Sequence, residues 1–519
     1  MLNHEKARVL GRSKSRRWRQ GRTGVTISVS LVLLLATGAW LSLVFSGGSR
    51  RRCWHKLKEW EGSPRSFPWQ PDEVDASAGS FRKTSGPVRD GGSGGRDDRE
   101  DEQLSLRHIE FGIAGSAQLW SNRKEFVRLW WRPEEMIGHV WLEEVLSEEE
   151  GLPPIRVSED ISRFSYTNPT GHPSGLRISR IVKESFRLGL PGVRWFVLGD
   201  DDTIFNPDNL VRVLAKYDHN EMVYIGGPSE SHSANTYFSH SMAFGGGGIA
   251  ISYPLAESIS KMQDECLERY PKLYGSDDRL HACISELGVP LTREYGFHQW
   301  DIRGSAHGLL SAHPVAPFIS IHHVEAVDPI YPGLNLLDSL KLFARAMKVD
   351  PLSFLQRSVC YDRRRRLTFA VSLGYVVQVF PNIVLPRDLE RSEQTYMAWN
   401  RLSSRNEFDF DTRDSYRSTC KKPVLFFLRD VRKAGNSTLG TYTRTKGKDE
   451  LKRRVLCFPR TLPLREVKDI QVIGKPLSEN WHLYPRRLCC QMTVNINNTL
   501  RLAVGQCERG KLSSVADIL

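Results

Sequence analysis

The sequence predicts an α/β fold, a β-sheet covered by helices, followed along the chain by a smaller, mostly β region. Between residues 107 and 345, short apolar runs typical of strands alternate with segments that have apolar residues at helical spacing. One of these runs, residues 195–198, leads into the three consecutive carboxylates of residues 200–202. Ligands of open α/β sheets bind beyond the carboxyl ends of the strands, so we expect a ligand site at this triplet.

The alternation defines the expected elements in order. Strands are predicted at residues 109–114, 140–142, 195–198, 222–225 and 249–252. Helices are predicted at residues 123–131, 178–188, 207–217 and 276–287. In the first helix Phe126, Leu129 and Trp130 recur at helical spacing. Because strands alternate with helices, a parallel sheet with covering helices is expected.

Beyond residue 350 the composition changes, and residues 350–519 are predicted to form a smaller, mostly β domain. Its β-like runs lie at residues 368–373, 375–380, 424–428 and 491–496. Eight cysteines lie beyond residue 260, and their spacing does not resemble a zinc site. In an oxidising compartment they are expected to pair as disulfides. Cys266 and Cys283 flank the Asp277-Asp278 segment and could pair, but the sequence does not determine the connectivity.

The N-terminal part predicts a membrane anchor. Residues 25–45 carry no charge and suffice for one bilayer-spanning helix, and residues 1–24 are rich in Lys and Arg. The basic side stays in the cytosol, which predicts a single-pass type II protein with a lumenal remainder. A cleaved signal peptide is the alternative, but the leader and the apolar run are long for one. Residues 46–106 are expected to be a flexible stem because of their Gly, Ser and Pro content.

Much of the excess positive charge of the chain, formally +13, lies in this basic leader. We interpret the basic leader as a topology signal and expect no nucleic-acid binding. The N-glycosylation sequons at Asn436 and Asn497 are consistent with a lumenal location.

Four groups of residues are candidates for chemistry. Crowded carboxylates at residues 200–202 favour a divalent cation with oxygen ligands, and a solvated acidic turn or a helix cap is the alternative. The run Gly245 to Gly248 suits close approach of a ligand to the main chain, and a tight turn or bulge is the alternative. It is not a phosphate-binding P-loop, because no Lys-Ser/Thr pair follows.

The other two groups are a pair of acids and a pair of histidines. Asp277 and Asp278 open a helix; one acid suffices to cap it, and the other is a candidate general base. His322 and His323 lie in an expected strand at residues 319–325, where neighbours point to opposite faces. At most one of them should therefore complete a carboxylate metal site, and an ordinary structural histidine is the alternative.

Together these blocks resemble the Fringe-like glycosyltransferases of glycosyltransferase family 31, and most closely the plant fringe-related proteins with a domain of unknown function. The resemblance spans about residues 107–340. It is carried by Arg194-Trp195-Phe196, Asp200-Asp201-Asp202, Gly245 to Gly248, Ser276-Asp277-Asp278-Arg279-Leu280, Phe297-His298-Gln299-Trp300-Asp301 and Ile321-His322-His323-Val324.

The resemblance implies a GT-A fold with a mixed sheet and inverting transfer from a UDP-sugar, dependent on Mn²⁺ (or Mg²⁺). Carried over onto this chain, it implies that Asp202 binds the metal directly. Asp200 and Asp201 are implied to contact the ribose or, through water, the metal, and Asp200 is counted with the metal site. His322 is the preferred histidine ligand.

The catalytic base implied by the resemblance is Asp278, which would deprotonate the acceptor hydroxyl as it attacks the anomeric carbon. Gly246 and Gly247 are expected to let the main chain approach the donor. A Golgi membrane location and a glycan, glycoprotein or small-molecule acceptor are implied. The alternatives are a non-catalytic UDP- or glycan-binding protein and a metal-dependent phosphatase or nuclease. The sequence lacks the second acidic cluster of a two-metal site, which argues against the last.

Overall fold

The computed structural model describes residues 103–400, 407–445, 457, 467–494 and 500–508. The predicted basic tail, the membrane anchor and nearly all of the stem lie outside these residues, as does Asn497. Among the described residues, no helix has the length and apolar character needed to cross a bilayer.

The first sheet has seven strands in the order β3-β2-β1-β4-β7-β6-β8. Its strands are β1 (Ile109–Ala114), β2 (Ile137–Leu142), β3 (Ile155–Val157), β4 (Trp195–Asp200), β6 (Tyr224–Gly226), β7 (Ile249–Ser252) and β8 (Leu291–Arg293). All neighbours pair in parallel except that β7 runs antiparallel to both β4 and β6. The α/β class with a mixed sheet is therefore confirmed. The parallel sheet expected from alternation alone is wrong at β7, because strand direction depends on the path of the connection between β6 and β7.

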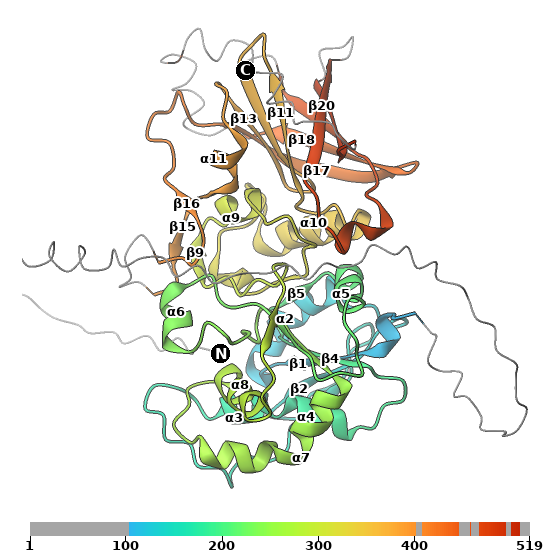
Figure 1. Cartoon of the computed structure of the whole chain (residues 1–519), viewed down its shortest axis with the longest axis vertical. Helices are drawn as coiled ribbons and strands as arrows, with labels where there is room; N and C mark the ends of the chain where they lie inside the picture. Colours follow the sequence, from blue (N-terminus) through green and yellow to red (C-terminus); the bar gives the residue numbers. More distant parts are fainter. Residues whose placement is uncertain (1–102, 401–406, 446–456, 458–466, 495–499, 509–519) are drawn as a thin grey trace, which may run out of the picture. The chain divides into compact units, whose positions relative to one another are not determined.

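The helices are α2 (Ala117–Arg128), α3 (Ser174–Ser179), α4 (Ile181–Arg187), α5 (Pro207–Leu214), α6 (His232–Tyr237), α7 (Tyr253–Arg269), α8 (Ser276–Glu286), α9 (His307–Ser311), α10 (Leu336–Val349) and α11 (Pro386–Glu390). Helix α2 begins before the predicted residue 123, and the helix predicted at residues 178–188 is divided at Arg180. Helix α7 had no counterpart among the expected elements. It packs on α4 and α8, and α3 packs on α8 (Figure 1).

The second sheet has eight strands in the order β11-β12-β13-β17-β18-β19-β21-β20. They are β11 (Arg357–Asp362), β12 (Leu367–Ser372), β13 (Val376–Phe380), β17 (Val424–Ala434), β18 (Ser437–Arg444), β19 (Asp469–Gly474), β20 (Leu488–Val494) and β21 (Leu500–Gln506). Only β19 and β21 pair in parallel. The sequon residue Asn436 lies exposed in the turn between β17 and β18. The described part of the C-terminal region is thus mostly β, as predicted.

Shorter elements lie outside the two sheets. The two-stranded sheets are β5 (Ile204–Phe205) with β10 (Ser320–Ile321), β9 (Ile302–Gly304) with β15 (Tyr396–Ala398), and β14 (Ser392–Glu393) with β16 (Thr412–Arg413). The 3-10 helices are Leu106–His108, Val324–Ala326 and Glu479–His482. Helix α10 packs against both β17 and α2 (Figure 1). One hydrophobic core runs from Leu106 to Val504, so the two sheets share buried apolar surface and stabilise each other.

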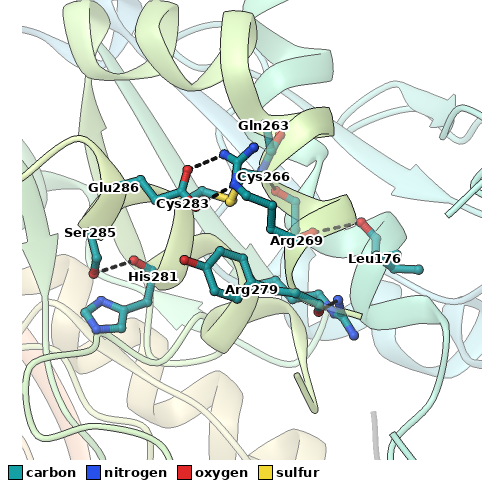
Figure 2. Close-up of a disulfide and its surroundings, with 11 residues drawn as sticks. Leu176, Gln263, Cys266, Arg269, Arg279, His281, Cys283, Ser285 and Glu286 are labelled. Atoms are coloured by element: carbon teal, nitrogen blue, oxygen red, sulfur yellow. Dashed lines mark hydrogen bonds and ion pairs between the residues drawn. A yellow bond between two sulfur atoms is a disulfide. The ribbon is translucent and has the colours of Figure 1, made fainter. Parts of the chain in front are cut away.

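Disulfides fix several of these elements. Cys266 of α7 bonds to Cys283 of α8 with their Cα atoms 5.8 Å apart, which confirms the predicted pair. An ion pair between Arg269 and Glu286 joins the same two helices beside it (Figure 2). The other bonds are Cys360–Cys490, Cys420–Cys457 and Cys489–Cys507. Because α8 begins with the candidate acids, the α7–α8 bond also restrains their position.

Candidate functional site

The acidic triplet begins at the last residue of β4, and its main chain is held by hydrogen bonds. The Asp201 amide donates to the carbonyl of Ala114 at the end of β1, at 2.9 Å. The Asp200 amide donates to Thr203 Oγ1 at 2.9 Å, and that hydroxyl donates to the Gly246 carbonyl at 2.7 Å. The triplet is therefore fixed to β1 on one side and to the glycine run on the other.

Asp200, Asp202 and His322 meet at this edge of the sheet. His322 Nε2 lies 3.4 Å from Asp200 Oδ2 and 3.1 Å from Asp202 Oδ1. One ligand atom from each residue lies within 4.8 Å of the others. Apart from this contact with His322, Asp202 Oδ1 is buried without a hydrogen-bond partner among the described residues. Two carboxylates and one imidazole with such an unsatisfied oxygen fit a divalent cation such as Mn²⁺.

The position of His322 depends on a short strand pair. Strand β10 pairs antiparallel with β5, which directly follows the triplet, so the residue after β10 is carried back to the acids. The strand predicted at residues 319–325 is wrong in extent, because β10 ends at Ile321. His323 has a φ of 53° and stacks on Trp399 at 4.2 Å. Thus His322 joins the acids and His323 packs against the C-terminal region.

Arg123 of α2 is a site residue that the sequence analysis did not single out. Its guanidinium lies 2.8 Å from Asp201 Oδ1, 3.1 Å from Asp202 Oδ2 and 2.7 Å from Glu325 Oε2. The arginine thus balances part of the charge of two buried acids. No local pattern around Arg123 could have revealed this role, because it depends on how α2 packs beside β4.

The charges of the cluster act on one another. Burial raises the pKa of Asp201 to about 7, helped by the charge of Asp202 and opposed by Arg123. Burial also acts to raise the pKa of Asp202, but His322 and Arg123 outweigh it and hold this pKa below the ordinary range. Asp202 is therefore ionised and able to accept a cation. The pKa of His322 is raised to about 10, because Asp202 and Asp200 outweigh the opposing effect of burial.

Asp277, and not Asp278, is the acid of α8 that faces the triplet. Asp277 lines a small cavity together with Asp200 and Gly245. Burial raises the pKa of Asp277 to about 6, and the charge of Asp200 adds to this effect. Asp278 instead interacts with the main chain of Tyr274 and with His281, and burial raises its pKa. The structure therefore does not bring the predicted base Asp278 into contact with the metal-binding candidates.

The glycine run packs against the protein itself. A Cβ atom on Gly245 would lie 2.5 Å from Asp277 Oδ1, and one on Gly246 would lie 2.2 Å from the His322 ring. The Gly247 amide donates to Gln299 Oε1 at 2.7 Å, and the Gly247 carbonyl accepts from the Ser320 hydroxyl. Because both main-chain groups of Gly247 are already bonded, its visible role is to leave room for its neighbours.

A cavity of about 460 Å³ lies beside the site. It opens beyond the carboxyl ends of β6 and β8, which run parallel to β4, so it shares an edge of the sheet with the triplet. Its walls combine aromatic and charged side chains from both sheet regions, including Glu230, Tyr295, His298, Trp300, Arg357 and Asp411. Glu230 is fixed there by His298 Nδ1 at 3.1 Å and by the Trp300 amide at 2.7 Å. Its size and mixed lining are those of a small-ligand site.

Comparison with protein families matches residues 234–490 to "Protein of unknown function, DUF604". The chain is also similar to curated glycosyltransferases. It is 32% identical over 107 residues to mouse "Beta-1,3-glucosyltransferase", covering 21% of each chain. It is 33% identical over 125 residues to zebrafish "Beta-1,3-N-acetylglucosaminyltransferase lunatic fringe", covering 21% of this chain and 32% of that one. The chain thus spans between about a fifth and a third of these relatives.

Among solved structures, the catalytic domain of Drosophila beta1,4galactosyltransferase 7 is matched at 12% identity. The match covers 36% of this chain and 64% of that domain with a TM-score of 0.20, which is too low to support an argument. The relation to known enzymes therefore rests on sequence, and the roles of individual residues rest on the geometry described above.

Proposed function

We propose that the chain is a Fringe-like glycosyltransferase that moves a sugar from a UDP-sugar to a hydroxyl acceptor with inversion and with the help of a divalent metal, a proposal supported by its similarity to curated enzymes of that kind. The observation that carries this proposal is the convergence of Asp200, Asp202 and His322 from distant segments beyond β4. The acceptor is a glycan, a glycoprotein or a small molecule. The similarity to two enzymes with "Beta-1,3" in their names supports the transferase class.

In this proposal Asp200, Asp202 and His322 hold Mn²⁺ or Mg²⁺. A cation bound there supplies Lewis-acid stabilisation of the charge that develops on the diphosphate leaving group. Arg123 keeps Asp202 in position by binding the oxygen that does not face His322. Asp201 is buried against Arg123 and supports the shape of the site. For Asp201 also to contact the ribose, as proposed, its carboxylate must bind Arg123 and the ribose together.

The acceptor hydroxyl attacks the anomeric carbon, the bond from that carbon to UDP breaks, and the hydroxyl proton passes to a carboxylate. We assign this proton transfer to the acid pair at the start of α8. The family resemblance identifies Asp278 as the base, whereas Asp277 is the acid beside Asp200. We retain Asp278 as the base and assign Asp277 to positioning the Gly245 segment, an assignment that the two Asn variants will separate.

The cavity beside the site is the proposed place for the acceptor. Carboxylates such as Glu230 and Asp411 accept hydrogen bonds from hydroxyl groups, and Tyr295 and Trp300 offer apolar ring surface. Gln299 lies in the chain between His298 and Trp300, the two residues that bond to Glu230. The Gln299 side chain accepts a hydrogen bond from the Gly247 amide, which connects this wall of the cavity to the glycine run. Substitution of the exposed Tyr295 by Ala should therefore weaken acceptor binding and leave donor binding unchanged.

The location is also part of the proposal. The uncharged residues 25–45 and the basic leader support a type II anchor in the Golgi membrane. Four disulfides in the described residues support a lumenal, oxidising environment for everything beyond the anchor. Protease protection of the C-terminal region in sealed microsomes, with an accessible N-terminus, is the measurement that tests this topology.

The test of the activity measures UDP release by the purified full-length chain from a panel of UDP-sugars with Mn²⁺, with and without mixed plant-glycan acceptors. Asp202→Asn and Asp278→Asn should abolish release, and Asp218→Asn, in an exposed turn, is the matched control. Loss in Asp277→Asn alone, with normal Asp278→Asn, would move the base to Asp277. Tight UDP–Mn²⁺ binding without transfer to any acceptor would indicate a non-catalytic binding protein. Absence of UDP binding would refute the proposal.

A further inference from the structure

A second group of metal-binding side chains lies on the surface, away from the acidic triplet. It consists of His232, His240 and Asp409, all exposed, and one ligand atom from each lies within 4.8 Å of the others. His232 Nδ1 is 2.6 Å from Asp409 Oδ1, and His240 Nε2 is 3.4 Å from Asp409 Oδ2. Both imidazoles therefore face the same carboxylate from its two sides.

The backbone holds these residues together, although they are far apart in the sequence. His232 is the first residue of α6, whose N-cap Ser231 accepts a hydrogen bond from the Ala234 amide. The Asp409 segment runs alongside: the His232 amide donates to the Glu407 carbonyl at 3.2 Å, and the Asp409 amide donates to the Glu230 carbonyl at 3.3 Å. Two ligands of the group are thus placed by main-chain hydrogen bonds and not by side-chain attraction alone.

The outer contacts orient the ligand atoms. Asn235 Nδ2 donates to Asp409 Oδ2 at 2.7 Å and fixes the carboxylate. On the far side of the His232 ring, Nε2 lies 3.4 Å from Thr236 Oγ1. A polar partner on one ring nitrogen leaves the other nitrogen directed at the metal position, an arrangement that recurs around protein metal ligands. An accidental surface ion pair does not need these outer contacts.

From this arrangement we propose that His232, His240 and Asp409 bind a divalent transition-metal ion, with zinc as the best match. Two imidazoles and one carboxylate are typical zinc ligands, and a water completes the tetrahedron. Tetrahedral zinc with bonds of about 2.0–2.1 Å keeps its ligand atoms roughly 3.3 Å apart. The 3.4 Å between His240 Nε2 and Asp409 Oδ2 is close to this value. His232 Nδ1 lies 2.6 Å from the other oxygen, Oδ1, so the exposed His232 ring must turn slightly for zinc to be held through Oδ2.

The two candidate metal groups differ in the ion they favour. The group beyond β4 has two carboxylates and one imidazole, whereas the surface group has two imidazoles and one carboxylate. More nitrogen ligands shift the preference from Mn²⁺ and Mg²⁺ to zinc, which also binds more tightly than Mn²⁺ to a given site of this kind. The two sites should therefore load with different metals in the same protein.

The proposed zinc would act as a clamp. It would join α6 and the loop after it to the segment that precedes β16, so it would tie the first sheet region to the C-terminal region. Phe238, between the two histidines, lies 5.8 Å from Phe244, measured between ring centroids. Phe244 directly precedes the glycine run. Zinc removal should therefore loosen the loop that leads into the site.

The test is the metal content of the full-length chain, purified in detergent without chelators and measured by inductively coupled plasma mass spectrometry. We expect about one zinc per chain, lost from the double variant His232→Ala/His240→Ala and strongly reduced in Asp409→Asn. His172→Ala, which removes an exposed histidine elsewhere, and Asp202→Asn should both keep the zinc. Thermal unfolding of each variant establishes that it is folded.

Cobalt binding provides a second measurement of the site that does not depend on enzymatic activity. Added Co²⁺ should give the visible absorption of a tetrahedral site in the wild-type chain and not in the double variant. The proposal is overturned if the folded wild-type chain neither contains zinc nor binds added zinc or cobalt, or if the double variant retains the metal. Because the readout is metal content, it stands apart from the presence or absence of sugar transfer.

Discussion

Substitution of Gly246 by Ala is expected to damage the metal site without unfolding the protein. A Cβ atom at this position would lie 2.2 Å from His322 Cε1 and 2.3 Å from Nδ1, whereas ordinary contacts are 3.4–4 Å. The ring must therefore retreat by roughly 1 Å, away from the positions that Asp200 and Asp202 require. Displacing a metal ligand by this amount should weaken Mn²⁺ binding at least about tenfold, since even changes to outer contacts cost 10–100-fold.

The overpacking itself should lower the free energy of unfolding by about 1–3 kcal/mol. Gly275→Ala is the matched control, because a Cβ atom there would meet no atom within 4 Å. Isothermal titration of Mn²⁺ in the presence of UDP measures the affinity, and thermal unfolding without metal measures the stability. Wild-type Mn²⁺ affinity in folded Gly246→Ala would refute the reasoning that places His322 in the metal site.

Three further changes have defined outcomes. Burial raises the pKa of Glu184 to about 7, so the stability contributed by this group is present below its unfolded pKa and is lost as the pH rises through 7. Between pH 4.5 and 7, the free energy of unfolding of the wild type, measured with urea, should fall relative to that of Glu184→Gln by no more than about 3 kcal/mol. Parallel curves of stability against pH for the two proteins would contradict this. Replacing Cys266 and Cys283 by Ser opens a loop of 17 residues and should cost about 3 kcal/mol, measured by thermal unfolding; an unchanged midpoint would contradict the bond's role. Arg123→Gln removes the arginine that Asp201 and Asp202 share and leaves His322 as the remaining partner of Asp202. Mn²⁺ should therefore raise the unfolding temperature more in the variant than in the wild type. An equal rise would argue against a shared electrostatic site.

The C-terminal region contributes residues to the surroundings of the candidate site. It supplies Trp399, which stacks on His323, and Asp409 and Asp411, which line the cavity beside the site. The shared core extends from the first strand to the last one. We therefore expect that removal of this region would expose apolar surface on the first sheet and distort the loop that carries His322.

What the sequence determined by itself was the local chemistry. The apolar run at residues 195–198 predicted a buried strand, and β4 covers that run and extends two residues beyond it, to Asp200. Cys266 and Cys283 were candidates for a disulfide because they flank the Asp277-Asp278 segment, and the structure bonds them. The choice of His322 over His323 followed from the resemblance, and the structure brings His322 to the acids. The strand and the cysteine candidates depend on short-range patterns of burial, polarity and spacing, whereas the choice of His322 depends on the resemblance.

The tertiary structure alone decided which distant residues meet. Arg123 is one helix residue among several arginines until α2 packs beside β4 and brings it to Asp201. The direction of β7 follows the path of the chain through the glycine run, and the choice of Asp277 as the acid facing Asp200 follows from the rotation of α8 about its axis. In the surface group, His232 and His240 lie in and shortly after α6, whereas Asp409 lies far along the chain, just before β16. Such contacts depend on the three-dimensional packing of many elements at once, and no local sequence pattern encodes that packing.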